Sequence, residues 1–95
     1  MASWKTERSY PGKSAQEIYQ ATKKVIDTLA GKYGLKHEGN DQGMTGTVKR
    51  TGVDGNYKAA GDKITIALDF GFLIPGAIRE KVQTEVTKQL DQLFA

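Results

Sequence analysis

One segment of this chain constrains its fold more than any other: a run of alternating apolar residues that ends at a short apolar corner before a proline. Apolar side chains occupy every second position of the run, at Ile64, Ile66, Leu68, Phe70 and Phe72. A period of two is typical of a β-strand with one buried face, and we expect this strand to span Lys63–Phe72. Because one face must be covered, the chain has to fold as a sheet packed against a second layer.

Turn signals precede this strand. Asp54-Gly55, within Val53–Asn56, predicts a two-residue hairpin turn, since both central residues tolerate a positive φ. Gly61-Asp62 predicts a second turn, directly before the long strand. Three shorter strands are expected around these turns, over Leu35–Glu38, Met44–Thr51 and Asn56–Ala60.

Two amphipathic segments are predicted to be helices. The first follows Ser14 and Glu17, which fit a capping box, and it stops before Gly34, so it should span Ala15–Tyr33. The second follows Pro75, a residue that suits the first turn of a helix. Apolar residues recur along this second helix at a helical period, at Ile78, Val82, Val86, Leu90 and Leu93.

An N-terminal strand over residues 3–10 completes the set of elements, and Pro11-Gly12 ends it. The order is then β-α-β-β-β-β-α in one α+β domain over residues 1–95. Short loops join the last four strands, so these should form an antiparallel β-meander. We expect two layers, with both helices on one face of the sheet and a polar open face opposite.

Composition excludes several classes of site. The chain has no cysteine, which excludes disulfides, thiolate nucleophiles, zinc–cysteine sites and iron–sulfur clusters. No apolar run approaches the roughly 18 residues of a membrane span, and the N-terminus lacks the apolar region of a signal peptide. We therefore expect a cytoplasmic protein with no cofactor.

Candidate catalytic residues are few. His37 is the only histidine, and we interpret it as a surface residue of a short strand without metal ligands at a suitable spacing. Asp54 and Asp62 lie at predicted turns, where aspartate bonds to the backbone. No phosphate-binding glycine motif and no nucleophile elbow occurs. The sequence predicts no catalytic residue, no metal site and a protein that is not an enzyme.

A nucleic-acid surface is an alternative interpretation, because the chain carries a net charge of +3. Basic and aromatic side chains on one open sheet face would form a platform on which bases stack. The candidates for such a platform are Lys49, Arg50, Lys58, Trp4, Tyr10 and Tyr57. Acidic residues dilute the basic ones, so this alternative is a weak nucleic-acid-binding module.

The corner Phe72-Leu73-Ile74-Pro75 is the one candidate contact site in the sequence. The sequence favours a buried corner, in which Phe72 continues the buried strand face and Leu73 or Ile74 packs against the start of the last helix. If the corner is exposed instead, it forms an apolar contact for a surface or a partner. A further alternative is a small hydrophobic ligand gripped between the sheet and the C-terminal helix.

Residues spread over 15–95 resemble a known family. The segments that carry the resemblance are Leu29–Leu35, Gly52–Gly55, Ile64–Leu73 and Gln89–Phe94. They are similar to the polyhydroxyalkanoic acid system (granule region) proteins of bacteria, and the strand–helix order also resembles a shortened helix-grip fold. The resemblance implies a non-enzymatic accessory role at granules of polyhydroxyalkanoate, a hydrophobic polyester. The granule surface or a granule protein would then be the partner, reached through Phe72–Pro75, and the oligomeric state stays open.

Overall fold

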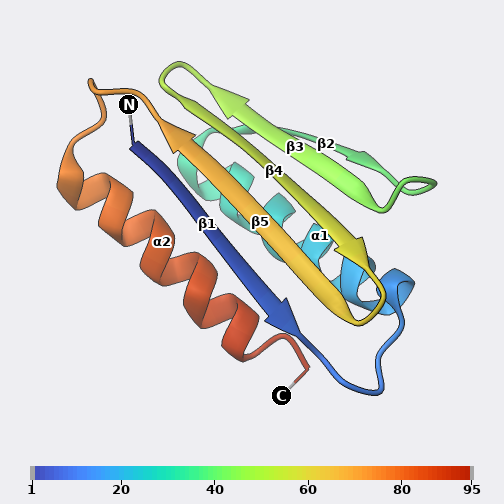
Figure 1. Ribbon diagram of the computed structural model, residues 1–95. Helices are drawn as coiled ribbons and strands as arrows, with labels where there is room; N and C mark the ends of the chain where they lie inside the picture. Colours follow the sequence, from blue (N-terminus) through green and yellow to red (C-terminus); the bar gives the residue numbers. More distant parts are fainter. Residues whose placement is uncertain (1, 95) are drawn as a thin grey trace.

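The computed structural model describes residues 2–94, which form a five-stranded antiparallel sheet with two helices packed on one face (Figure 1). The strands are β1 (Ala2–Ser9), β2 (Lys36–Asn40), β3 (Thr45–Arg50), β4 (Val53–Ala60) and β5 (Lys63–Phe70). The helices are α1 (Ala15–Tyr33) and α2 (Gly76–Asp91). The predicted two-layer α+β architecture and its element order are confirmed.

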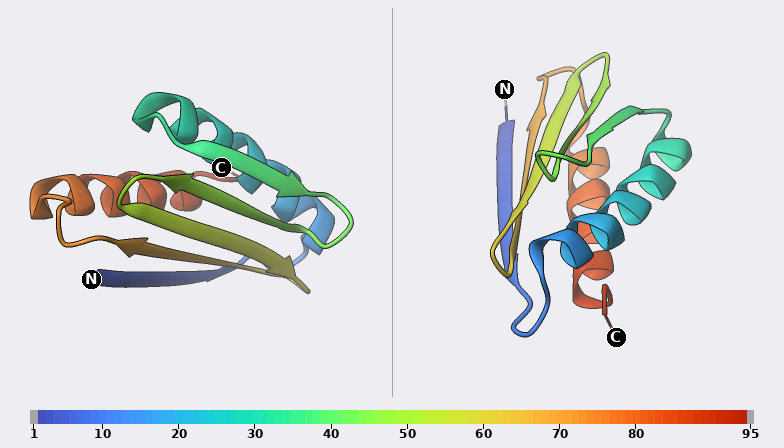
Figure 2. Two further views of the ribbon diagram at one scale, coloured as in Figure 1. Left: turned by 90° about the horizontal axis from the view of Figure 1, so that it is seen from above. Right: turned by 90° about the vertical axis from the view of Figure 1, so that its right-hand side faces the viewer.

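The strands are arranged in the order β1-β5-β4-β3-β2. Strands β2 to β5 form the expected meander. Strand β1 lies at the edge of the sheet and pairs with β5, with Ser9 opposite Lys63 at one end of the pair. Helix α1 lies behind the middle of the sheet, whereas α2 runs along the β1 edge (Figures 1 and 2). The helices therefore cover different parts of the same face.

The core lies between this face and the helices, because the central strands β4 and β5 alternate buried residues with more exposed ones. In β5 the side chains of Ile64, Ile66, Leu68 and Phe70 are buried. Ile18, Tyr19, Ile26 and Leu29 of α1 pack into the same cluster. Complete burial of one such side chain stabilises the fold by roughly 1.5–3 kcal/mol. The buried residues come from alternate positions of the strand and from one face of the helix, so the two periods of the sequence together define the core.

Local signals account for the bounds of α1. The side chain of Ser14 accepts a hydrogen bond from the Glu17 N–H at 3.1 Å, and the Glu17 carboxylate bonds back to the Ser14 N–H. Gly34 ends the helix with a φ of 68°, in the left-handed region that glycine adopts readily. The predicted span Ala15–Tyr33 is confirmed.

The predicted turn at Asp54-Gly55 is wrong. The β3–β4 turn lies at Thr51 and Gly52, and Asp54 and Gly55 are inside β4. Gly52 has a φ of 85°, so it supplies the positive φ that the turn needs. Gly55 has a packing role instead, since a Cβ there would stand 2.5 Å from Leu68 Cδ2.

Helix α2 is less deeply buried than its apolar stripe predicts. Val86 and Leu90 are buried, and Val82 is partly buried against the core. Ile78, in the first turns, is 47% exposed. The C-terminal half of α2 therefore anchors the helix, while its N-terminal half leaves the predicted stripe uncovered. No helix in the described residues is long and apolar enough to cross a membrane.

Candidate apolar contact surface

The corner between β5 and α2 projects beyond the end of the sheet (Figure 1). Phe72 is 84% exposed and Leu73 is 78% exposed. The expectation that Phe72 continues the buried face of the strand is therefore wrong. Strand β5 ends at Phe70, and a turn follows in which the Ile74 N–H donates to the Gly71 carbonyl at 3.0 Å. This turn carries both side chains away from the core.

Ile74 behaves differently from its two neighbours in the corner. Its side chain is partly buried and packs against the core cluster. It also lies against Gly52, because a Cβ at residue 52 would stand 3.1 Å from Ile74 Cδ1. The Gly71 N–H donates to the Gly52 carbonyl at 2.7 Å. Side-chain packing and a backbone hydrogen bond thus hold the corner against the β3–β4 turn.

The exposed part of the corner continues into α2. Pro75 precedes the helix with a φ of −59° and is exposed. We use the name apolar tip for Phe72, Leu73, Pro75 and Ile78, four exposed residues of this corner and the first turn of α2. Isolated exposed apolar side chains are common on soluble proteins, whereas contiguous ones mark contact surfaces. The apolar tip places four exposed apolar residues within seven positions of the chain.

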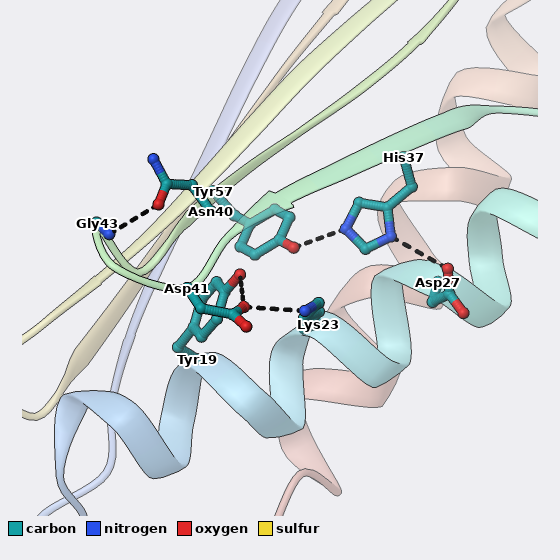
Figure 3. Close-up of polar contacts among 8 residues, drawn as sticks. All are labelled: Tyr19, Lys23, Asp27, His37, Asn40, Asp41, Gly43 and Tyr57. Carbon is teal, nitrogen blue, oxygen red and sulfur yellow. Dashed lines mark hydrogen bonds and ion pairs between the residues drawn. The ribbon is translucent and has the colours of Figure 1, made fainter.

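The predicted surface position of His37 is also wrong. Only 6% of its side chain is exposed, and the ring lies between strand β4 and helix α1 (Figure 3). Its Nε2 lies 2.6 Å from the Tyr57 hydroxyl, and its Nδ1 lies 3.3 Å from Asp27 Oδ1. The alternation of Leu35 with His37 at the start of β2 is the signal that could have placed this ring on the buried face.

A second set of polar contacts lies beside the first (Figure 3). The Tyr19 hydroxyl donates to Asp41 Oδ1 at 2.8 Å, and Lys23 Nζ donates to the same oxygen at 2.9 Å. The hydrogen bonds from Lys23 and Tyr19 lower the pKa of the Asp41 carboxyl. The same contact with Asp41 raises the pKa of Lys23. These bonds tie α1 to the β2–β3 turn.

The chain Asp27–His37–Tyr57 has the residue types of a proton relay, but its two inner members, His37 and Tyr57, are buried, and only Asp27 is exposed. Tyr57 is 1% exposed, and burial raises its pKa, with the charges of Tyr19, Asp27 and Asp41 adding to the effect. A tyrosine that holds its proton this tightly is a poor nucleophile or base near neutral pH. These side chains serve the packing of the helix on the sheet. Residues 2–94 contain no group of three or more His, Cys, Asp or Glu side chains that could hold a metal ion.

The platform expected for nucleic acid does not form from the residues predicted for it. Trp4 and Tyr10 pack against the core cluster on the helix-covered face, and Tyr57 is buried there. Lys49 and Lys58 lie on the open face, in the register positions opposite Asp54 and Thr45. The basic and aromatic side chains are therefore on opposite faces of the sheet. Arg50 instead donates to the Tyr33 carbonyl at the end of α1, at 2.7 Å.

A hollow of about 490 Å³ lies between β1 and α2. Trp4 is its one aromatic residue, and the remaining lining is polar: Gln83, Thr84, Thr87, Lys88, Asp91 and Gln92. Sites for hydrophobic ligands are lined mainly by apolar side chains. The hollow beside the C-terminal helix thus differs in chemistry from the apolar-ligand site that the sequence offered as an alternative.

Comparison with known proteins identifies a family for this chain. Residues 12–94 match the family described as "Putative polyhydroxyalkanoic acid system protein". No curated protein and no solved structure matches the chain. The matched residues include both helices, four of the strands and the apolar tip. The chain therefore belongs to the polyhydroxyalkanoic acid system protein family.

Proposed function

We propose that this protein is a non-enzymatic accessory protein that contacts the surface of polyhydroxyalkanoate granules through the apolar tip. The observation that carries the proposal is the exposure of Phe72 and Leu73, at 84% and 78%. Membership of a polyhydroxyalkanoic acid system family supports this choice of partner. A polyhydroxyalkanoate is a polyester with apolar side groups. An apolar polymer surface is a suitable partner for exposed apolar side chains.

The expected strength of this contact follows from the area that it removes from water. Complete burial of one phenylalanine or leucine side chain is worth roughly 1.5–3 kcal/mol. Phe72 and Leu73 together would then contribute about 3–6 kcal/mol, before the cost of immobilising the protein. Because this gain is small, contact through one apolar tip should be reversible. Bound molecules of the protein would then exchange with free ones at the granule surface.

The scaffold of the corner supports a contact role for the tip. Ile74 packs against Gly52 and the Gly71 N–H bonds to the Gly52 carbonyl, so the base of the corner is anchored. Anchoring lowers the conformational entropy that binding would otherwise cost. The two exposed side chains can then enter an apolar surface without unfolding the core.

The test is sedimentation of the purified protein with protein-free polyhydroxyalkanoate particles. We expect the wild type to co-sediment, and Phe72→Asp and Leu73→Asp to stay largely in the supernatant with unchanged circular dichroism. Gln42→Asp is the matched control, since it adds the same charge at an exposed residue of the β2–β3 turn. Background sedimentation of the wild type, or equal sedimentation of wild type and Leu73→Asp, would contradict the proposal.

The same assay separates the polyester surface from a granule protein as the partner. Isolated native granules carry proteins, whereas particles precipitated from pure polyester carry none. Binding to both kinds of particle supports contact with the polymer itself. Binding to native granules alone would reassign the apolar tip to a protein partner.

A further inference from the structure

A groove on the outer side of the helix layer has no role in the function proposed above. Two hollows, of about 480 Å³ and about 290 Å³, lie between α1 and α2. They share Lys24, Val25 and Gln89, so they form one continuous depression, which we call the interhelical groove. The larger hollow has a volume within the range of roughly 300–1,000 Å³ that small-molecule sites occupy.

The floor of the interhelical groove is apolar. It comprises Ala21, Val25 and Leu29 of α1 and Leu93, which follows α2. Leu29 is 5% exposed and belongs to the core cluster, and Val25 packs against that cluster. The groove follows α1 from residue 20 to residue 32, a length of about 18 Å at 1.5 Å per residue. An extended acyl chain would fit this floor along its length.

The rim of the groove is rich in hydrogen-bond donors. Lys24 lines both hollows, and no ion-pair partner of Lys24 occurs within the described part of the chain. The side-chain amides of Gln20, Gln89 and Gln92 also line the groove. Its one acidic residue, Glu85, is paired with Lys32 at 3.6 Å. The rim therefore suits a ligand that carries acceptors and a negative charge.

We infer that the interhelical groove binds a short oligoester of hydroxy acids that ends in a free carboxylate. Ester carbonyls accept hydrogen bonds and donate none, which suits the amide and ammonium donors of the rim. The alkyl groups of the ester would lie on the floor of Ala21, Val25 and Leu29. The terminal carboxylate would pair with Lys24, through a charge-assisted hydrogen bond. The identity of the ester as a hydroxyalkanoate rests on the proposed function.

A partner helix is a weaker candidate for this groove. An amphipathic helix that docks in a groove makes contact through apolar anchors at i, i+3, i+4 and i+7, and its backbone carbonyl acceptors are already used by its own hydrogen bonds. The unpaired Lys24 and the three glutamines would then face a surface without a matching acceptor. An acceptor-rich chain satisfies these donors directly, and burying them unsatisfied would oppose binding.

The experiment is a titration of the isotope-labelled full chain with the trimer of 3-hydroxybutyrate, followed by amide chemical shifts. We expect shift changes confined to α1 residues 20–32 and to residues 85–93. Lys24→Glu and Lys24→Gln should each weaken binding by about tenfold or more, as expected for the loss of a charge-assisted hydrogen bond. Lys58→Glu, on the open face of the sheet, is the matched control and should bind like the wild type.

Two further ligands test the chemistry that the inference assigns. The methyl ester of the same trimer lacks the carboxylate and should bind about tenfold more weakly. Octanoate has the carboxylate but no internal ester, so it should also bind more weakly than the trimer. The absence of shift changes at millimolar trimer, shifts outside the groove, wild-type binding by Lys24→Glu, or equal binding of octanoate would each overturn the inference.

Failure of this inference is distinguishable from failure of the proposed function, since the two use different residues. Leu73→Asp should bind the trimer normally and lose sedimentation with polyester particles. Lys24→Glu should lose the trimer and still sediment. If the wild type sediments with polyester particles but shows no response to the trimer, the groove inference is refuted and the proposed function is not.

Discussion

The side chain of Ile74 lies directly against Gly52, so that a Cβ atom at residue 52 would stand 3.1 Å from Ile74 Cδ1. The Gly71 N–H donates to the carbonyl of the same glycine at 2.7 Å. The corner after β5 is thus braced by the β3–β4 turn. This contact sets the direction in which Phe72 and Leu73 leave the core, and it connects the fold to the proposed contact surface.

Replacing Gly52 with alanine should destabilise the protein for two reasons. The φ of 85° is strained for any residue with a Cβ, at a cost of about 1–2 kcal/mol, and the new Cβ would press on Ile74. Gly12→Ala is the matched control, because Gly12 has a φ of 87° and open space around it. Urea unfolding should show a loss in both variants and a larger loss for Gly52→Ala. Equal losses of unfolding free energy in the two variants would show that the contact between residue 52 and Ile74 does not contribute.

Phe70 and Phe72, two residues apart in the chain, should differ sharply in their contribution to stability. Phe70 is 1% exposed and Phe72 is 84% exposed. Phe70→Ala should lower the free energy of unfolding by about 3–5 kcal/mol, as cavity-forming substitutions do. Phe72→Ala should change it by less than about 0.5 kcal/mol. A large loss of stability in Phe72→Ala, measured by urea unfolding, would show that the side chain is buried in solution.

Stability should fall at alkaline pH because of buried tyrosine. Burial raises the folded-state pKa of Tyr57 above the unfolded value of about 10. Above pH 10 the unfolded chain therefore releases a proton that the folded protein keeps, so the free energy of unfolding decreases as pH rises. Tyr57→Phe should show a shallower decrease between pH 9 and pH 11 in urea unfolding. Equal slopes for the two proteins would assign the alkaline loss to other groups.

The same Tyr57→Phe variant should be less stable at pH 7. The substitution removes the hydroxyl that bonds His37 Nε2 at 2.6 Å and leaves a ring nitrogen buried without a partner. Such a loss costs about 1–3 kcal/mol. The double variant with His37→Phe tests the pairing, since its loss should be smaller than the sum of the two single losses. Additive losses would show that the two side chains are not coupled.

Acid should weaken the link between α1 and the β2–β3 turn. Hydrogen bonds from Lys23 and Tyr19 lower the folded-state pKa of Asp41. Its contribution to stability is therefore complete above the unfolded pKa of about 3.9 and is lost as pH falls through the folded value. Asp41→Asn should be less stable than the wild type at pH 7, and the difference should shrink as pH falls through the lowered folded-state pKa of Asp41. A difference in unfolding free energy that is constant from pH 7 to pH 2 would contradict this.

The helix α1 and the long strand β5 could be predicted because their signals are local. The capping box of Ser14 and Glu17 and the terminal Gly34 define α1 without reference to the rest of the chain. The period of two in β5 identifies its buried face in the same way. The fold class followed from the order of such elements and the shortness of the loops.

The β3–β4 turn could not be predicted locally because two glycines compete for it. Asp54-Gly55 has the stronger intrinsic turn propensity, whereas Gly52 forms the turn in the structure. The decision depends on register: Gly55 lies beside Leu68 and Val48, where a Cβ would stand 2.5 Å and 2.7 Å from their methyl carbons. Gly46 likewise leaves room for the Tyr57 ring, which a Cβ at residue 46 would overlap. These contacts join different strands, and no local pattern contains them.

The candidate site divides in the same way. The sequence by itself determined that Phe72-Leu73-Ile74-Pro75 is an apolar corner between a strand and a helix, since hydropathy and proline placement are local properties. It did not determine which of these side chains is buried, and it favoured the wrong answer for Phe72. Only the tertiary structure decided that Ile74 packs on Gly52 while Phe72 and Leu73 face solvent. The physical reason is that exposure depends on neighbours supplied by distant parts of the chain, and here the β3–β4 turn places Gly52 against Ile74.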